Sequence, residues 1–86
     1  MNQRAARAAR FLAPVMHPRW CPADDYQLLT DRAIGVSFHV IAQQLGRSVI
    51  SVEQRWHRLR AVPHAATLLS DLGLTSQPYR IGENHD

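Results

Sequence analysis

The fold is decided by residues 35–60, which read GVSFHVIAQQLGRSVISVEQRWHRLR. Ser37 is placed to cap a helix that ends at Gly46. The apolar residues of that helix follow the i, i+3, i+4, i+7 spacing of one buried face: Phe38, Ile41, Ala42 and Leu45. After a short turn, Ser48 is placed to cap a second helix over residues 49 to 60 or 61. Two helices joined by a tight turn that contains glycine predict a helix-turn-helix motif.

The second of these helices has two distinct faces when its residues are spaced at about 100° each. The inward stripe is apolar and consists of Val52, Trp56 and Leu59. The opposite face carries Ile50, Gln54, His57 and Ala61, with Ser51 and Arg58 on one shoulder and Glu53 on the other. We expect this outer face to contact the partner.

Another helix is expected over residues 22–34, ahead of the motif. Pro22 is favoured at a first helical position, and Asp24 and Asp25 fall in the first turn, where the helix dipole favours anions. Leu28, Leu29 and Ala33 fit one apolar stripe, and Gly35 suits a left-handed stop. Because 86 residues can bury only one small core, we predict an all-α fold built on a three-helix bundle.

Charge is distributed unevenly along the chain. The ten basic side chains outnumber the seven acidic ones, all ten are arginines, and the formal net charge is +3, which favours a polyanionic partner. Shifts in composition divide the chain into a basic flexible arm (residues 1–19), a helix-turn-helix domain (residues 20–62) and a Leu-rich short helix with a disordered tail (residues 63–86).

The arm carries Arg4, Arg7 and Arg10, whose spacing of three places them on roughly one face of a nascent helix. It has no evident apolar face, so we expect residues 2–12 to be mobile and at most partly helical. Three interpretations stay open: a frayed terminus, an arm that follows DNA phosphates or a minor groove, and a short organelle transit peptide.

The C-terminal stretch contains enough leucine for a short helix that ends at Gly73. Its apolar face either packs across the three-helix body or forms a homodimer surface through Leu68, Leu69 and Leu72. After Gln77 and Pro78 we expect disorder.

Three aromatic residues, Trp20, Phe38 and Trp56, are spaced eighteen positions apart and resemble the aromatic triad of Myb/SANT-like helix-turn-helix repeats. The segment from Gly35 to Leu59 is also similar to bacterial regulators of the GcrA type, whose recognition helices end in a similar His-Arg-Leu. The resemblance covers about 40 of the 86 residues. The further matching segments are Asp24-Asp25, Ile41-Ala42, Leu45-Gly46-Arg47-Ser48, Val52, Arg55-Trp56 and His57-Arg58-Leu59.

The resemblance implies that the helix over residues 49–60 is a recognition helix that reads bases through Ile50, Glu53, Gln54 and His57. Phosphate contacts are expected from Arg47, Ser51, Arg55, Arg58 and Arg60. The predicted core consists of Trp20, Leu29, Phe38, Ile41, Leu45, Val52, Trp56 and Leu59. Within it, we expect Trp56 to be buried against Trp20, Phe38 and Leu45.

These observations favour a transcriptional regulator that binds double-stranded DNA sequence-specifically in the cytoplasm, at the nucleoid. The alternative is a protein-binding adaptor or antiactivator that contacts a transcription regulator or an RNA polymerase subunit. Glu53 and Ile50 on the predicted recognition face favour the alternative, because an acid repels phosphates and isoleucine offers no hydrogen bond.

Other function classes find little support in the sequence. No apolar run approaches the roughly 18 residues of a membrane span, so we expect a soluble protein without membrane contact. The single cysteine excludes an internal disulfide, and the spacings of His17 with Cys21 and of His57 with His64 do not match paired zinc ligands. No catalytic motif is present. We therefore expect neither an enzyme nor a metal or cofactor.

Overall fold

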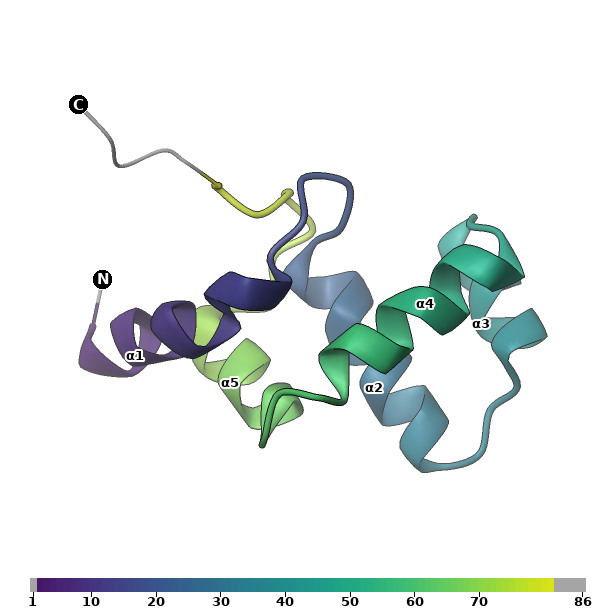
Figure 1. Ribbon diagram of the computed structural model, residues 1–86, viewed down its shortest axis with the longest axis horizontal. Coiled ribbons are helices and arrows are strands. Elements are labelled where there is room, and N and C mark those ends of the chain that lie inside the picture. The colour runs from purple at the N-terminus through teal and green to yellow at the C-terminus, as the bar shows by residue number, and fades with distance from the viewer. Residues whose placement is uncertain (1, 82–86) are drawn as a thin grey trace.

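The computed structural model describes residues 2–81, and every regular element within them is helical. The helices are α1 (Gln3–Leu12), the 3₁₀ turn η1 (Ala13–Val15), α2 (Pro22–Ala33), α3 (Phe38–Leu45), α4 (Val49–Leu59) and α5 (Ala65–Leu72) (Figure 1). The predicted all-α class is confirmed. None of the helices in these residues has the length and apolar character needed to cross a membrane.

Local capping signals set the ends of α3 and α4. The Ser37 hydroxyl accepts a hydrogen bond from the Val40 amide at 3.2 Å, and the Ser48 hydroxyl accepts one from the Ser51 amide at 3.1 Å. Gly46 ends α3 with a φ of 66°, in the left-handed region that favours glycine. The turn from α3 to α4 is therefore as tight as the sequence predicts.

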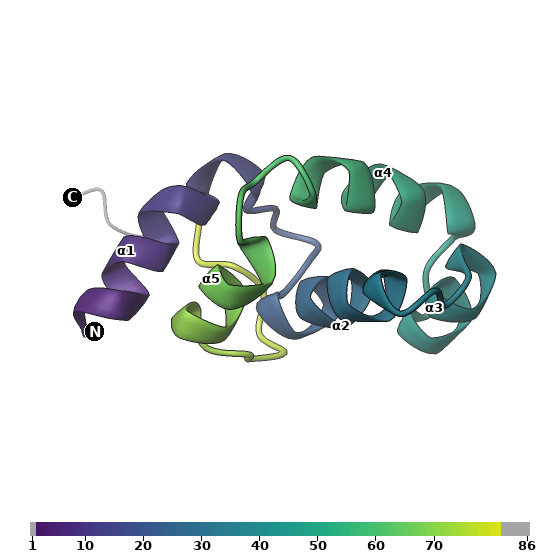
Figure 2. The same cartoon turned by 90° about the horizontal axis from the view of Figure 1, so that it is seen from below.

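Helix α2 lies alongside α4, and α3 crosses at one end of this pair (Figure 2). Leu28 of α2, Ile41 of α3 and Val52 of α4 are fully buried in one hydrophobic cluster. Helix α2 begins at Pro22 with two aspartates in its first turn, as expected from the sequence.

The residues expected in the core fall into two groups. Trp20, Ile41, Val52 and Leu59 are buried, whereas Leu29, Phe38, Leu45 and Trp56 are half-buried and pack against the buried group. The expectation that Trp56 is buried is wrong. Its indole meets the Phe38 ring edge-on, with centroids 5.5 Å apart, and it lies at the rim of the core, where the Arg60 guanidinium covers it at 4.5 Å.

Helix α1 corrects the expectation of a mobile arm without an apolar face. The Asn2 side chain caps the helix by accepting a hydrogen bond from the Ala5 amide at 2.7 Å. Ala5, Ala8 and Leu12 are buried, because their spacing of three and four residues puts them on one face. This face packs against α5 (Figure 1). The expectation is wrong because small alanine side chains allow a close approach of the two helices, and Leu12 then enters the core.

Helix α5 supplies the surface that α1 covers. Leu68 and Leu69 are 8% and 0% exposed, and Leu72 is half-buried against the same core. Of the two uses expected for the leucine run, packing across the body is the one observed. Leu68 and Leu69 are largely covered within the chain, which leaves little of their surface for a homodimer contact.

The chain beyond Gln77 packs back on the body, where we expected disorder. The Tyr79 amide donates a hydrogen bond to the Trp20 carbonyl at 3.4 Å, and the Ala23 amide donates one to the Thr75 carbonyl at 3.1 Å. The expectation is wrong as far as residue 81, because the Tyr79 side chain enters the core. The same expectation for residues 82–86 concerns positions outside the described residues.

One hydrophobic cluster extends from Ala8 to Tyr79 and so draws on all three of the stretches that composition separates, residues 1–19, 20–62 and 63–86. The molecule is elongated, measuring 40 × 23 × 20 Å. Helices α1 and α5 lie at one end and α3 lies at the other, with α2 and α4 running between them (Figures 1 and 2).

Candidate functional site

The outer face of α4 is open to solvent. Ile50 is 66% exposed, and Gln54 and His57 are exposed as well. Glu53 is half-buried, and its position seven residues before Arg60 places both side chains on the same shoulder of the helix. Three of the four residues expected to read bases are therefore exposed along one helix face.

A groove of about 640 Å³ runs along the opposite shoulder of α4. Its other wall is the segment between η1 and α2, which brings His17 and Arg19 beside α4. The residues that line it are His17, Arg19, Trp20, Arg47, Ser48, Ser51, Gln54, Arg55 and Arg58. Four of these nine are arginines, so the groove favours an anion.

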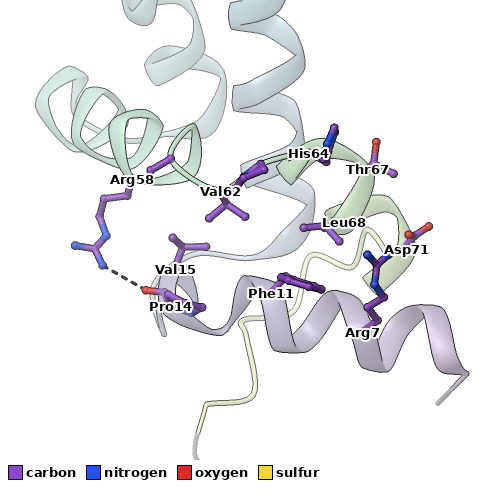
Figure 3. Close-up of a pocket in the computed structure, with 12 residues that line it drawn as sticks. Arg7, Phe11, Pro14, Val15, Arg58, Val62, His64, Thr67, Leu68 and Asp71 are labelled. Carbon is purple, nitrogen blue, oxygen red and sulfur yellow. Dashed lines mark hydrogen bonds between the residues drawn. The ribbon is translucent and has the colours of Figure 1, made fainter.

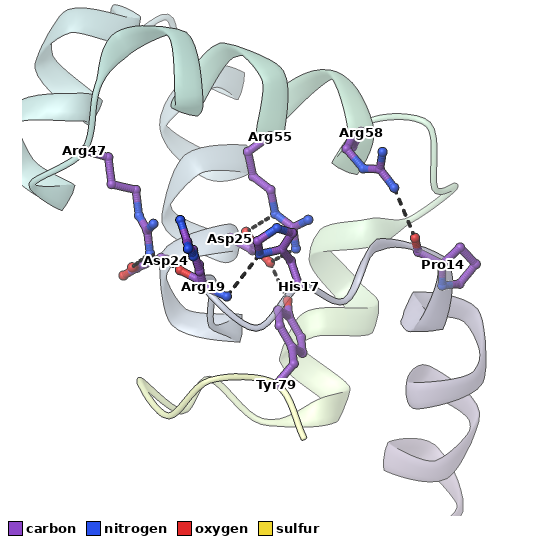
Figure 4. A network of polar contacts seen from close by, with 9 residues as sticks. All are labelled: Pro14, His17, Arg19, Asp24, Asp25, Arg47, Arg55, Arg58 and Tyr79. Atoms are coloured by element: carbon purple, nitrogen blue, oxygen red, sulfur yellow. Dashed lines mark hydrogen bonds and ion pairs between the residues drawn. The ribbon is translucent and has the colours of Figure 1, made fainter. Parts of the chain in front are cut away.

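Arg47 is held firmly at this groove. Its guanidinium lies 3.7 Å from the centroid of the Trp20 ring. Nη2 donates hydrogen bonds to the Arg19 carbonyl at 2.8 Å and to Asp24 Oδ2 at 3.3 Å (Figure 4). Asp24 offsets part of the positive charge of Arg47. Arg47 therefore forms part of the groove wall but attracts an anion less strongly than an unpaired arginine would.

Arg55 is only 4% exposed, and its expected role as a phosphate contact is wrong. Nε donates to Asp25 Oδ1 at 2.9 Å and Nη2 donates to Asp25 Oδ2 at 2.7 Å, a bidentate pair. The Tyr79 hydroxyl donates a third hydrogen bond, to Oδ2 at 2.5 Å (Figure 4). The fully buried Asp25 carboxylate requires a cation beside it, and Arg55 is committed to that task.

This network of Asp25, Arg55 and Tyr79 joins α2, α4 and the C-terminal segment behind the groove. Burial of the phenol and, next, the negative charge of Asp25 raise the pKa of Tyr79. The Tyr79 hydroxyl therefore stays protonated and remains a hydrogen-bond donor at neutral pH.

The other two arginines of the α4 region lie on opposite shoulders. Arg58 lines the groove and is exposed, and its Nη2 donates a long hydrogen bond of 3.4 Å to the Pro14 carbonyl. Arg60 is stacked over Trp56, away from the groove. Ser51 is half-buried and lines the groove. The arginines with the most freedom to meet an anion there are thus Arg19 and Arg58.

The three arginines expected to form an arm lie elsewhere. Arg4, Arg7 and Arg10 are exposed on α1, and the guanidinium of Arg7 lies 5.2 Å from the centroid of the Phe11 ring. None of the three lines the groove beside α4. The structure therefore does not bring them together with the outer face of α4.

Sequence reasoning missed four residues around the site: His17, Arg19 and Ser48 in the groove, and Tyr79 behind it. The available signal for the first two was their position just before Trp20, a predicted core residue that fixes the neighbouring loop. No local signal connects Tyr79 with Asp25, because the two residues are 54 positions apart in the sequence.

The groove offers hydrogen bonding to anions and to base edges, through guanidinium, hydroxyl and amide groups. Cys21 is buried at the start of α2, and this burial raises the pKa of its thiol, which disfavours the nucleophilic thiolate. Among residues 2–81, no three His, Cys, Asp or Glu side chains gather in a way that could hold a metal ion.

Comparison of the chain with protein-family models, with curated proteins and with solved structures found no match. The geometry of α4 and its groove is therefore the basis for assigning a function.

Proposed function

We propose that this chain is a Myb/SANT-like helix-turn-helix protein that binds double-stranded DNA, acts as a transcriptional regulator and works at the nucleoid in the cytoplasm. In this proposal α2, α3 and α4 form the DNA-binding unit, and α4 enters the major groove. The observation that carries the proposal is the exposed face of α4 with a groove beside it that is lined by Arg19, Arg47 and Arg58.

Base reading is assigned to the outer face of α4. The Gln54 amide can pair with adenine through two hydrogen bonds, and Ile50 can contact a thymine methyl group. His57 lies one turn beyond Gln54 on the same face, and both side chains are exposed. Glu53 lies on the shoulder away from the groove, so its carboxylate can accept from a cytosine amino group without facing Arg19 and Arg58.

Phosphate binding is assigned to the groove. Arg19 and Arg58 come from different elements and are both exposed, so they can contact separate phosphates of one strand. Arg47 adds a third contact whose charge Asp24 partly offsets. With two to three phosphate contacts, log affinity is expected to fall against log salt concentration with a slope of about −2 to −3.

The test is a binding selection from random duplex DNA, followed by affinity measurements over a range of salt concentrations. Enrichment of a common sequence and a slope in the stated range would support the proposal. A flat salt response, or the absence of any shift of duplex DNA at low salt, would contradict it.

Paired variants separate the groove from the rest of the surface. Arg58→Gln is expected to weaken binding to all duplexes alike and to make the salt slope shallower by about 1. Arg60→Gln, on the opposite shoulder of the same helical segment, is the matched control and is expected to have a smaller effect, because its guanidinium is stacked on Trp56.

For base reading, Gln54→Ala is expected to reduce the difference in binding free energy between the best site and random DNA by about 1–3 kcal/mol. Gln77→Ala removes an exposed glutamine from the C-terminal segment and is expected to leave that difference unchanged.

A second candidate function is a protein-binding adaptor that contacts a transcription regulator or an RNA polymerase subunit. Apolar exposure supports it: Ile34 is 80% exposed, Ile50 66% and Val40 43%, all in α3, in α4 or in the turn after α2. Recovery of such a partner in a pull-down, together with no binding of duplex DNA at low salt, would favour this candidate over the first.

A further inference from the structure

A second concave site lies between α1, α5 and the segment that joins α4 to α5 (Figure 3). Its volume is about 730 Å³, within the range of roughly 300–1,000 Å³ that is typical of small-molecule pockets. Phe11, Val15, Val62 and Leu68 give it an apolar lining. Because Val15 and Leu68 belong to the buried core, the floor of this pocket is formed by well-packed side chains.

The rim of the pocket is also shaped by the fold. His64 has a φ of 58°, a left-handed conformation that residues with a side chain rarely adopt. It is the residue at which the chain turns from the α4–α5 link into α5, and its side chain lines the pocket.

The pocket has an arginine at each end, and the two arginines have different neighbours. At one end the Arg7 side chain points toward Asp71 (Figure 3), and its guanidinium lies 5.2 Å from the centroid of the Phe11 ring. At the other end Arg58 donates a hydrogen bond to the Pro14 carbonyl at 3.4 Å, a length at which such bonds are weak. A guanidinium carries five N–H donors, so Arg58 retains donors for an anion at this end.

We propose that this pocket binds a small amphipathic monoanion, such as an aromatic or medium-chain carboxylate. The apolar body of the ligand covers Phe11, Val62 and Leu68, and its carboxylate pairs with Arg58 in a charge-assisted hydrogen bond. The pocket shares Arg58 with the groove beside α4 but none of the other residues that line that groove, and the proposal does not require that the chain bind DNA.

The test uses 2-naphthoate as the probe, with neutral 2-naphthalenemethanol for comparison, titrated into the full-length ¹⁵N-labelled chain and followed by two-dimensional NMR. Saturable shifts are expected for amides in residues 7–15 and 58–71. Naphthoate is expected to bind about tenfold more tightly than the neutral compound, which corresponds to one charge-assisted hydrogen bond.

Variants locate the two parts of the ligand. Arg58→Gln is expected to remove the advantage of naphthoate over the neutral compound, whereas Arg60→Gln leaves it intact. Phe11→Ala is expected to weaken both compounds, and because Phe11 is 51% exposed the variant should fold, as its NMR spectrum will show.

Three results would overturn the proposal: equal affinity for the two compounds, shifts centred on the groove beside Arg19, or no saturable shift up to the solubility limit of naphthoate. Shifts of the same amides that depend on protein concentration without any probe would overturn it too, because they would show that a second copy of the chain covers the pocket.

Discussion

Asp25 is fully buried, and an isolated carboxylate in that position would be costly because it loses its hydration. The bidentate pair with Arg55 and the Tyr79 hydroxyl together satisfy both of its oxygens. A buried ion pair gives little net stability by itself, but removal of one partner leaves an unpaired charge in the core. The positions of α2, α4 and the C-terminal segment are thus linked through one carboxylate.

Removal of the Tyr79 hydroxyl tests this link. Tyr79→Phe is expected to lower the free energy of unfolding by about 1.5–3 kcal/mol, because a hydrogen bond to a buried charge is lost. The measurement is urea denaturation followed by circular dichroism. Tyr26→Phe is the control, expected to change stability by less than about 0.5 kcal/mol, since the Tyr26 hydroxyl makes none of the hydrogen bonds found in residues 2–81. Equal effects of the two substitutions would show that the hydrogen bond from Tyr79 to Asp25 does not stabilise the fold.

The raised pKa of Tyr79 predicts a loss of stability in alkali. Its cause is burial, followed by the charge of Asp25, and the ordinary value is 10.0. Because the folded state holds the proton more tightly than the unfolded state, the stabilisation is complete below about pH 10 and declines above it, by up to about 1.4 kcal/mol per pH unit.

In a Tyr26→Phe background Tyr79 is the single tyrosine, so tyrosinate absorbance reports on it alone. The absorbance is expected to rise together with unfolding and not before it. Tyrosinate that forms while the circular dichroism spectrum is still that of the folded chain would contradict the prediction.

At the scale of elements, α1 is an integral part of the core. Leu12 is 0% exposed, so Leu12→Ala is expected to lower the free energy of unfolding by about 2–5 kcal/mol through lost burial and the cavity left behind. Arg10→Ala changes an exposed residue of the same helix and is expected to alter stability by less than about 0.5 kcal/mol. Thermal unfolding of both variants gives the comparison. If Leu12→Ala melts like the parent, α1 does not belong to the cooperative unit.

The elements that could be predicted from the sequence are those with local signals. Ser37, Gly46 and Ser48 act on amides and carbonyls within a few residues, so the ends of α3 and α4 could be predicted from the sequence. The packing of α1 was missed although Ala5, Ala8 and Leu12 lie on one face, because two alanines and one leucine give a weak apolar signal and nothing local indicates that α5 lies against them.

The candidate site shows the same division. The exposure of Gln54 and His57 follows from helical periodicity, which the sequence contains. Periodicity places Arg55 beside Leu59 at the edge of the inward stripe, where an arginine is expected to turn toward solvent; its pairing with the buried Asp25, thirty positions earlier, explains why it is buried. His17 and Arg19 join the groove through the path of a loop, for which residue spacing provides no rule.

At the scale of the whole molecule, Arg58 belongs to two sites at once. It lines the groove beside α4 and also the pocket between α1 and α5, and the one hydrogen bond found for its side chain in residues 2–81 is the long one to Pro14. A guanidinium that pairs with a carboxylate in the pocket is not free to contact a phosphate beside the groove. The proposed DNA binding and the proposed ligand binding are therefore expected to oppose each other.

The prediction is that saturating 2-naphthoate weakens DNA binding by about five- to tenfold and makes the salt slope shallower by about 1, which is the loss of one phosphate contact. Because binding free energies are reciprocal, saturating DNA must weaken naphthoate binding by the same factor. Neutral 2-naphthalenemethanol is expected to leave DNA affinity unchanged, since it does not hold Arg58.

Fluorescence anisotropy of labelled duplex DNA measures both affinity and salt slope, with and without the probe. In Arg58→Gln the effect of naphthoate should vanish, because the shared side chain is absent, while in Arg60→Gln it should persist. An equal effect of naphthoate on the parent and on Arg58→Gln would contradict the coupling and point to naphthoate binding in the groove itself. Unchanged DNA affinity, at concentrations where NMR shows the pocket filled, would also contradict the coupling. It would show that pairing of Arg58 with naphthoate does not weaken DNA binding.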